Sequence, residues 1–467
     1  MRDLAWATAA ELVAAYRAKT LSPVEATAMV LRRAEGLNPE LNAFCLLDAK
    51  AANDAARASE ARWQRGEPLG PLDGVPVSIK DIILTKGWPT LRGSKAINPD
   101  QPWNEDGPLV ARLREQGSVI FGKTTTSEFA AKATTNTALC GVTRNPWDLA
   151  RTPGGSSGGA AASVAAGISA MAVGTDAGGS IRMPANFCGI YGFKPGGGRV
   201  PMYPPTPYAT LAGFGPMTRT VMDAALMFSV ISRPDSRDWE ALPYDPVQYQ
   251  DNLAADPKSW RIAWSPTLCG ARVDPEVAAL TERAAKVFET LGAKVELVEK
   301  VFDDQRDLMH KLTRGLTDYA FHKFTPAQLS VMDRDLVKRI EESRGTSAIE
   351  HFDAEMQRAQ LARQMNDFHQ RYDLLLTPVT CVPAFDAAGD APEGYGAREW
   401  YPFTPPFNLT RQPAASLPCG FTAKGLPVGL HLVGPRHRDL LVLQASWAFE
   451  QAAPWLARRP AVAERSF

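Results

Sequence analysis

The segment GVPVSIKD at residues 74–81 is the first clear strand of the chain, an apolar run that ends on Lys80 and Asp81. A helical pattern at 107–116, a strand at 118–122 and a helix of small residues that begins near residue 158 follow it. Seven further strand-like runs lie at 169–174, 189–193, 261–265, 294–298, 373–377, 414–418 and 427–433. Helical patterns cover 7–35, 48–65, 219–232, 275–291, 330–370 and 437–451. Strands and helices that alternate in this way predict an α/β fold with a largely parallel or mixed sheet.

The composition narrows the classes of function. The 467 residues carry 51 basic and 51 acidic side chains, which argues against nucleic acid or an anionic membrane as the main partner. The N-terminus lacks the pattern of a signal peptide, and six cysteines are scattered without a short spacing. We therefore expect a cytoplasmic protein whose thiols are free and buried. The uncharged residues 152–175 are mainly Gly, Ala and Ser, which favours close backbone packing over a membrane span.

Two motifs resemble catalytic signatures, but their contexts disagree with them. GSVIFGKT at 117–124 matches a phosphate-binding loop, yet a helix precedes it and its interior reads as a strand. GGSSGG at 154–159 contains the spacing of a nucleophile elbow, which follows a strand directly and needs a histidine partner. All six histidines come after residue 309, so a triad with histidine would need a remote residue.

Two other features carry little weight. Asn408 begins a glycosylation sequon, but nothing else in the sequence indicates secretion. No spacing of histidines and cysteines resembles a metal site, so we expect no metal.

Three polar groups stand in settings that exclude water. Lys80 ends an apolar strand, where burial would lower its pKa; the simpler alternative is a lysine paired with Asp81. Ser156 and Ser157 lie among four glycines, which either hold a strained backbone or form a plain flexible turn. GTDAGGSIR at 174–182 places Ser180 after two glycines, an arrangement in which successive backbone N–H groups are able to converge on an anion. The simpler alternative is that this segment forms a tight turn.

Together these segments resemble the amidase signature family, hydrolases with a Ser–cis-Ser–Lys triad. The matching text includes GVPVSIKD, TRNPWDLARTPGGSSGGAAASVAAG (143–167), GTDAGGSIRMPANFCGIYGFKP (174–195) and LLLTPVTCVPAF (374–385). The resemblance covers nearly the whole chain and implies one domain with a mixed, mainly parallel sheet of about eleven strands, without a cofactor. We divide that domain into a helical part at 1–65, a signature core at 70–225, a variable helical region at 235–370 and a C-terminal sheet and helix at 371–467.

The resemblance also implies roles for individual residues. Ser180 is the nucleophile, Ser156 bridges in a cis peptide after Gly155, and Lys80 is the base. The positions implied for binding the oxyanion or bordering the acyl group are Ala177, Gly178, Gly179 and the backbone near Ala130, together with the N–H of Ser180. Those implied for orienting the loop are Ser157, Asp176 and Arg182.

The substrate is predicted from the pocket segments. The family includes the glutaminase A subunit of Glu-tRNA(Gln)/Asp-tRNA(Asn) amidotransferases, in which we expect an acid before the Asn-Leu segment to hold the glutamine ammonium group. Residues 400–408 are instead aromatic and contain no acid, and Tyr203, Tyr208 and Phe214 lie among prolines. This favours a stand-alone hydrolase of small apolar or aromatic amides, and also of esters or carbamates. Two points stay open here: the protein could be the glutaminase member of such a complex, and it could assemble as a homodimer.

Overall fold

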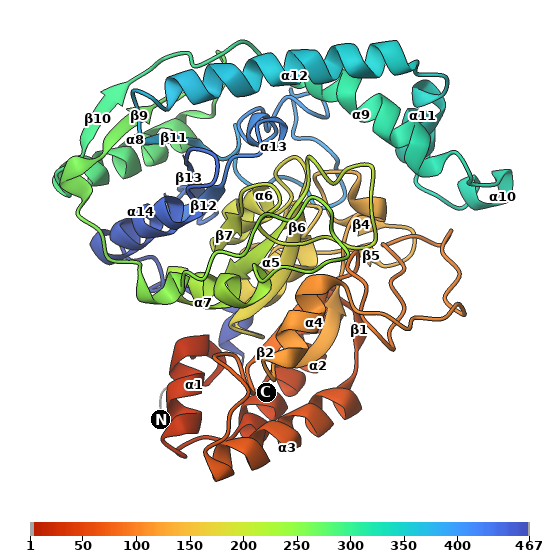
Figure 1. Cartoon of the computed structure of the whole chain (residues 1–467), viewed down its shortest axis with the longest axis vertical. Helices are drawn as coiled ribbons and strands as arrows, with labels where there is room; N and C mark the ends of the chain where they lie inside the picture. The colour runs from red at the N-terminus through yellow and green to blue at the C-terminus, as the bar shows by residue number, and fades with distance from the viewer. Residues whose placement is uncertain (1–3, 466–467) are drawn as a thin grey trace.

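The computed structural model of the chain describes residues 4–465, and its centre is one large β-sheet (Figure 1). In spatial order the eleven strands of that sheet are β1 (Phe44–Leu47), β3 (Val119–Thr124), β2 (Pro76–Lys80), β6 (Met171–Asp176), β8 (Gly213–Thr218), β7 (Tyr191–Lys194), β12 (Ala414–Phe421), β13 (Pro427–Val433), β11 (Leu374–Pro378), β9 (Arg261–Trp264) and β10 (Lys294–Leu297). A separate pair is formed by β4 (Asn136–Thr137) and β5 (Gly141–Val142). The mixed sheet of about eleven strands is confirmed, and strands from all four predicted segments join it.

The expectation of a mainly parallel sheet is wrong. Of the ten neighbouring pairs in the large sheet, six are antiparallel and four are parallel. The parallel pairs are β2 with β3, β2 with β6, β9 with β10 and β9 with β11. The hairpin of β12 and β13 contributes one antiparallel pair, as a short connection requires. Antiparallel β8 lies between β6 and β7 and contributes two more.

The two strands of the large sheet that the sequence pattern misses, β1 and β8, both pair in the antiparallel sense. β8 contains Gly213, Gly215 and Pro216, residues that normally indicate a turn. β1 has only four residues and lies between the predicted helical stretches 7–35 and 48–65, without a periodic pattern of its own. The first 65 residues are therefore mainly helical, as expected, but they also supply the edge strand of the sheet.

Helices cover the sheet on both sides. They are α1 (Ala9–Arg17), α2 (Pro23–Leu41), α3 (Ala49–Arg65), α4 (Pro108–Glu115), α5 (Gly158–Ala165), α6 (Arg182–Cys188), α7 (Val221–Ile231), α8 (Pro275–Thr290), α9 (Arg306–Phe321), α10 (Pro326–Leu329), α11 (Arg334–Ser343), α12 (Ala348–Phe368), α13 (Pro406–Leu409) and α14 (Asp439–Ala452). The predicted start of α2 is confirmed: Ser22 and Glu25 form a capping box with Pro23 in the first turn. The pattern missed α6, α9, α10 and α13.

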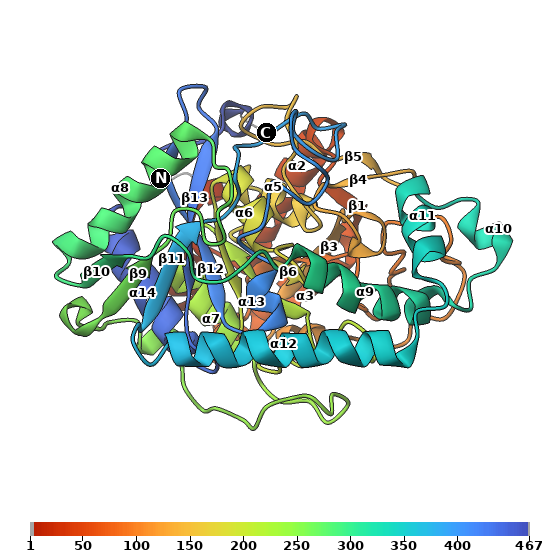
Figure 2. The ribbon, with the colours of Figure 1, turned by 90° about the horizontal axis from the view of Figure 1, so that it is seen from above.

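Helices α9, α11 and α12 form a layer on one side of the molecule (Figures 1 and 2). α12 runs along this side, and α9 packs against both α11 and α12. Among residues 4–465 no helix combines the length and the apolar character that crossing a membrane requires. The small-residue stretch instead forms the loop before α5, α5 itself and β6, and every residue of α5 is buried.

Candidate active site

Lys80 lies at the end of β2 with its side chain fully buried. Its Nζ is 2.6 Å from the Ser156 hydroxyl oxygen, 2.8 Å from that of Ser157 and 2.7 Å from that of Thr175. The alternative that Lys80 pairs with Asp81 is wrong, because Asp81 pairs with Lys123 at 2.9 Å. β2 thus delivers the lysine to three hydroxyl groups and to no adjacent carboxylate.

The surroundings of Lys80 favour its neutral form. Complete burial lowers the pKa of Lys80 well below its usual value, and the charge of Asp176 opposes this shift only in part. The Ser157 hydroxyl donates to the Thr175 carbonyl at 3.2 Å, so its proton is already engaged. Ser157 and Thr175 are therefore placed to accept hydrogen bonds from the lysine. The lone pair of a neutral Lys80 is left for the proton of Ser156.

The Ser156 loop is held by close packing against residues 134 and 135. The Gly155–Ser156 peptide is cis, as the resemblance implied. A Cβ atom on Gly155 would come within 2.5 Å of the Thr134 carbonyl oxygen, so only glycine fits at this position. The Thr135 hydroxyl donates to the Gly154 carbonyl at 2.8 Å and accepts from the Gly158 N–H at 3.1 Å. The glycines therefore serve close packing, not a loose turn.

Ser180 lies two residues before α6 and lines the same cavity as Ser156. The Ser157 N–H donates to the Ser180 carbonyl at 3.3 Å, which ties the two serine loops together. Within residues 4–465 the Ser180 hydroxyl makes no hydrogen bond, so it is available to a ligand in the cavity.

The backbone amides before Ser180 divide into two groups. Among the described residues, the N–H groups of Ala177, Gly178 and Ser180 have no hydrogen-bond partner, and all three residues line the cavity. The N–H of Gly179 instead donates to the Asp176 carboxylate at 2.7 Å, and Gly179 is not among the residues that line the cavity. The structure therefore differs from the expectation for Gly179, whose amide is engaged in holding the loop.

Asp176 and Arg182 form a fully buried ion pair behind this loop. The two guanidinium contacts to the carboxylate are both 2.9 Å long. Burial opposes ionisation of Asp176, but the charge and hydrogen bonds of Arg182 outweigh it and lower the pKa of the carboxyl group. Arg182 also donates to the Asn408 side chain at 2.6 Å, and Asn408 donates back to Asp176 at 3.0 Å. Both ionic groups are thus fully hydrogen-bonded, as buried charges require.

Four residues of this region were missed by the sequence analysis. Thr175 contacts Lys80 directly, while Asn408, Thr404 and His431 all contact Arg182. Arg182 donates to His431 Nε2 at 3.0 Å, and burial together with the charge of Arg182 lowers the pKa of His431, which keeps the ring neutral. Asn408 is 1% exposed and is therefore inaccessible as a glycosylation site. No local signal marks these residues, because each acts through a partner far away in the sequence.

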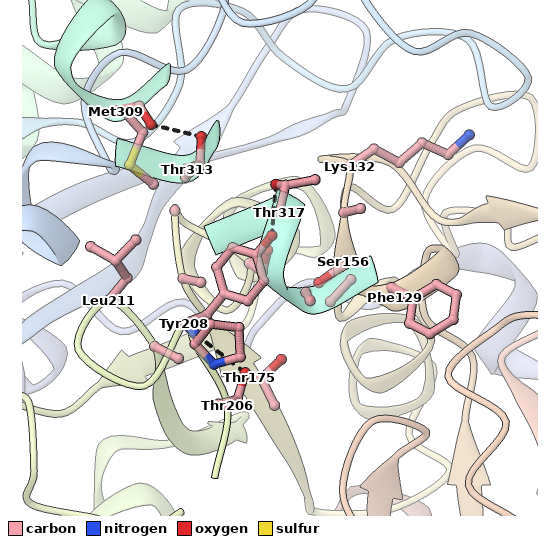
Figure 3. Close-up of a pocket in the computed structure, with 18 of the residues that line it drawn as sticks. Phe129, Lys132, Ser156, Thr175, Thr206, Tyr208, Leu211, Met309, Thr313 and Thr317 are labelled. Atoms are coloured by element: carbon pink, nitrogen blue, oxygen red, sulfur yellow. Dashed lines mark hydrogen bonds between the residues drawn. The ribbon is translucent and has the colours of Figure 1, made fainter. Parts of the chain in front are cut away.

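The cavity in front of the serines has a volume of about 640 Å³. Figure 3 shows Tyr208, from the loop before β8, pointing toward Thr317 of α9, and the two hydroxyl groups are 2.8 Å apart. Leu211 and Met309 line another part of the wall (Figure 3). Ala130 also lines the cavity, and its positive φ of 57° follows a second positive φ at Phe129. The cavity thus combines an apolar wall with hydroxyl groups, as small-molecule sites commonly do.

The aromatic residues predicted to shape the pocket divide between two environments. Tyr203, Tyr208 and Phe214 line the cavity, as does Tyr401. Trp400, Phe403 and Phe407 are fully buried in the hydrophobic core instead. The alternative of simple core packing therefore holds for these three residues.

The segment that resembles a phosphate-binding loop is a strand. Residues Val119–Thr124 form β3, and Lys123 is fully buried, where it binds Asp81 and the Thr90 hydroxyl. Its ammonium group points to protein partners and not to an open loop. All six cysteines are free, but only Cys188 and Cys381 are fully buried, so the expected burial holds for two of them.

Comparisons with known proteins identify the family of this chain. A family model described as Amidase matches residues 25–443. An acylamidase of Rhodococcus erythropolis is 35% identical over 477 residues, covering 98% of each chain. The glutamyl-tRNA(Gln) amidotransferase of Moorella thermoacetica has an A subunit that is 37% identical over 500 residues, covering 98% of this chain and 99% of that protein. The crystal structure of a bacterial aryl acylamidase of the amidase signature family superimposes with a TM-score of 0.91 at 32% identity, covering 99% of both chains. Matches of this identity over the full length are enough to assign the family, and the chain belongs to the amidase signature family.

Proposed function

We propose that this protein hydrolyses small amides through an acyl-enzyme on Ser180. The observation that carries the proposal is the buried Lys80, 2.6 Å from the hydroxyl oxygen of Ser156, together with the cavity that Ser156 and Ser180 both line. In the family, the acylamidase and the aryl acylamidase are similar to this chain over nearly their whole length. A neutral lysine next to a hydroxyl group is a suitable general base for such a reaction.

The first half of the reaction forms the acyl-enzyme. Lys80 takes the proton of Ser156, and Ser156 takes that of Ser180, so that the Ser180 oxygen attacks the substrate carbonyl carbon. The N–H groups of Ala177, Gly178 and Ser180 stabilise the oxyanion that develops. Loss of one such donor typically raises the barrier by roughly 3 kcal/mol. When the C–N bond breaks, Ser156 returns a proton to the departing amine.

The second half releases the acid. A water molecule gives a proton to Ser156 and attacks the ester carbonyl, and Ser180 regains its proton as the acid leaves. Asp176 and Arg182 do not react in this scheme. Their buried ion pair fixes the loop that carries the amides, since Asp176 also accepts the N–H groups of Gly179 at 2.7 Å and Ile181 at 3.2 Å.

The second candidate function is that of the glutaminase component of a glutamyl-tRNA(Gln) amidotransferase, because proteins of that class are as similar to this chain as the acylamidase is. We favour the stand-alone hydrolase because residues 400–408 supply no carboxylate for an ammonium group and Tyr401 lines the cavity there. An unpaired ammonium group in such a cavity would be unfavourable.

Amine release from purified protein separates the two candidates. The panel contains short and aromatic anilides, an aryl carbamate and free glutamine, with Ser180→Ala as the blank. We expect release from anilides and none from glutamine. Release from glutamine alone, or only after partner proteins are added, would establish the amidotransferase component instead. Full activity of Ser180→Ala would refute the acyl-enzyme.

A further inference from the structure

The cavity in front of Ser180 carries an excess of positive charge. Seven lysines and arginines line it, against three aspartates and glutamates. Each of the three carboxylates already has a cation: Asp176 pairs with Arg182, Asp304 with Arg306 at 2.6 Å, and Glu342 with Lys338 at 3.9 Å. The one fully buried carboxylate of the three, Asp176, is thus engaged by Arg182, while Asp304 and Glu342 form solvent-exposed pairs.

Four of the arginines that line the cavity lack a counter-ion. Within residues 4–465, no carboxylate lies within ion-pair distance of Arg92, Arg314, Arg339 or Arg398. All four are half-buried, and burial lowers the pKa of Arg92 and Arg339, which reflects the cost of keeping a cation out of water. Lys132, on the same cavity, shows the usual solution, because it pairs with Asp333 at 2.9 Å.

Two of these guanidinium groups act on the same tyrosine. Arg398, Arg339 and Tyr401 all line the cavity; burial raises the pKa of Tyr401, and the charges of Arg398 and Arg339 oppose this shift. That hydroxyl group makes no hydrogen bond within the part of the chain that the structure describes. Arg339 donates to the Ala131 carbonyl at 2.8 Å and to the Asp335 carbonyl at 3.4 Å, and Arg398 contacts His310 at 3.5 Å. Most of the N–H donors of both groups remain free.

We propose that the site prefers amides whose non-reacting end carries a carboxylate, bound by Arg398 and Arg339 with Tyr401 as a further donor. A planar guanidinium group binds a carboxylate through two parallel hydrogen bonds, and a second cation adds attraction in a half-buried site. The proposal rests on the proposed function and narrows its substrate class to acidic amides without an ammonium group. The apolar wall receives the body of the molecule.

The kinetic test compares two pairs of probes. 4-Acetamidobenzoate and 4-nitroacetanilide differ in charge on the amine side, where the neutral nitro group has the shape of a carboxylate. Glutaryl and pentanoyl 4-nitroanilides differ on the acyl side. For at least one pair, we expect Arg398→Gln to lower the ratio of kcat/KM for the acidic over the neutral probe by tenfold or more. The ratio of each variant is compared with that of the unmodified protein, so that the difference in leaving ability between the two amines of a pair cancels.

Lys323→Gln is the matched control, because Lys323 is a cation on the same cavity that is exposed to solvent. Lys323→Gln should leave the ratio unchanged. If it lowers the ratio as much as Arg398→Gln does, the preference for acidic probes comes from the overall positive charge of the cavity, and the proposed subsite is overturned. Tyr401→Phe keeps the ring and should lower the ratio by a smaller factor, which preserves the test if Arg398→Gln fails to fold. A ratio unaffected by both Arg398→Gln and Tyr401→Phe would also overturn the proposal.

Binding to Ser180→Ala separates this proposal from the proposed function. Calorimetry should show tighter binding of the acidic member of one probe pair, and Arg398→Gln in that background should remove the difference. Tighter binding of the neutral member in both pairs would contradict the acidic subsite even if anilides are hydrolysed. Preferential binding of an acidic probe without turnover of any anilide by the unmodified protein would leave the subsite intact and refute the hydrolase.

Discussion

The Lys80 nitrogen and the Ser156 hydroxyl oxygen lie 2.6 Å apart in a region from which solvent is excluded, since both side chains are fully buried. A proton shared over this distance passes between the two groups without crossing water. The protonation state of Lys80 therefore decides whether Ser156 is able to pass its proton to the lysine.

The first prediction concerns the pH dependence of activity. Because burial lowers the pKa of Lys80, kcat/KM should rise with pH through an acid limb that lies well below the ordinary lysine range. Lys80→Arg keeps a charge that does not titrate, so it should be inactive from pH 6 to 10. An anilide assay over this range measures both, and activity of Lys80→Arg at any pH would argue against lysine as the base.

The same shift predicts a pH dependence of stability. The folded state binds a proton at Lys80 less tightly than the unfolded chain, so stability rises with pH between the lowered pKa and about 10.5, the ordinary lysine value. Lys80→Met cannot titrate, and its free energy of unfolding should therefore fall relative to the unmodified protein as the pH rises through this window. Urea denaturation at several pH values checks it, and a constant difference would contradict a neutral Lys80.

Thr175 should affect catalysis through Lys80. Its hydroxyl oxygen lies 2.7 Å from the lysine nitrogen, so Thr175→Val removes one of three oxygens that orient the amine. We expect kcat to fall by up to roughly a hundredfold, the cost of displacing a catalytic group by about 1 Å. Thr175→Ser retains the hydroxyl group and should recover most of the rate. Equal losses in the two variants would indicate a packing effect.

Removing Arg182 should destabilise the protein strongly. Arg182→Met leaves Asp176 buried without its cation, which typically costs roughly 3–5 kcal/mol. Urea denaturation at pH 7 measures the loss. Lys286→Met breaks the solvent-exposed pair with Glu282 and is the control, for which we expect no measurable change. Comparable stabilities of the two variants would contradict the role assigned to the buried pair.

Gly179 and Gly178 should differ sharply in their tolerance of alanine. Gly179 has φ of +121°, and a Cβ atom there would overlap the Thr404 hydroxyl and lie 2.8 Å from its Cβ. The nearest atom to a Cβ on Gly178 is the Met309 terminal carbon at 3.6 Å, an ordinary contact. Gly179→Ala should therefore lower the melting temperature by several degrees, whereas Gly178→Ala should leave it within about a degree. Equal melting temperatures would show that the loop adapts freely.

The sequence predicted nine of the eleven strands of the sheet and the three residues of the proposed triad. Lys80, Ser156 and Ser180 lie in contiguous motifs, where glycines and an apolar strand indicate their surroundings locally. The sequence analysis missed β8 because Gly215 and Pro216 suggest a turn. Since β8 pairs antiparallel with β6, missing it contributed to the wrong expectation of a mainly parallel sheet. Strand direction depends on which segments become neighbours, which hydrophobic periodicity does not report.

Local composition and spacing determined that this chain forms an α/β protein with a lysine and two serines in water-excluded settings. Tertiary structure decided what surrounds them. Arg182 and Asn408 are 226 residues apart in the sequence, and their contact exists only because α13 packs behind the serine loop. Within residues 4–465 Arg398 meets no carboxylate, whereas Arg182 does. Which arginine finds a partner depends on the segments that folding brings together, because charge pairing acts over a few ångströms of space and not along the chain.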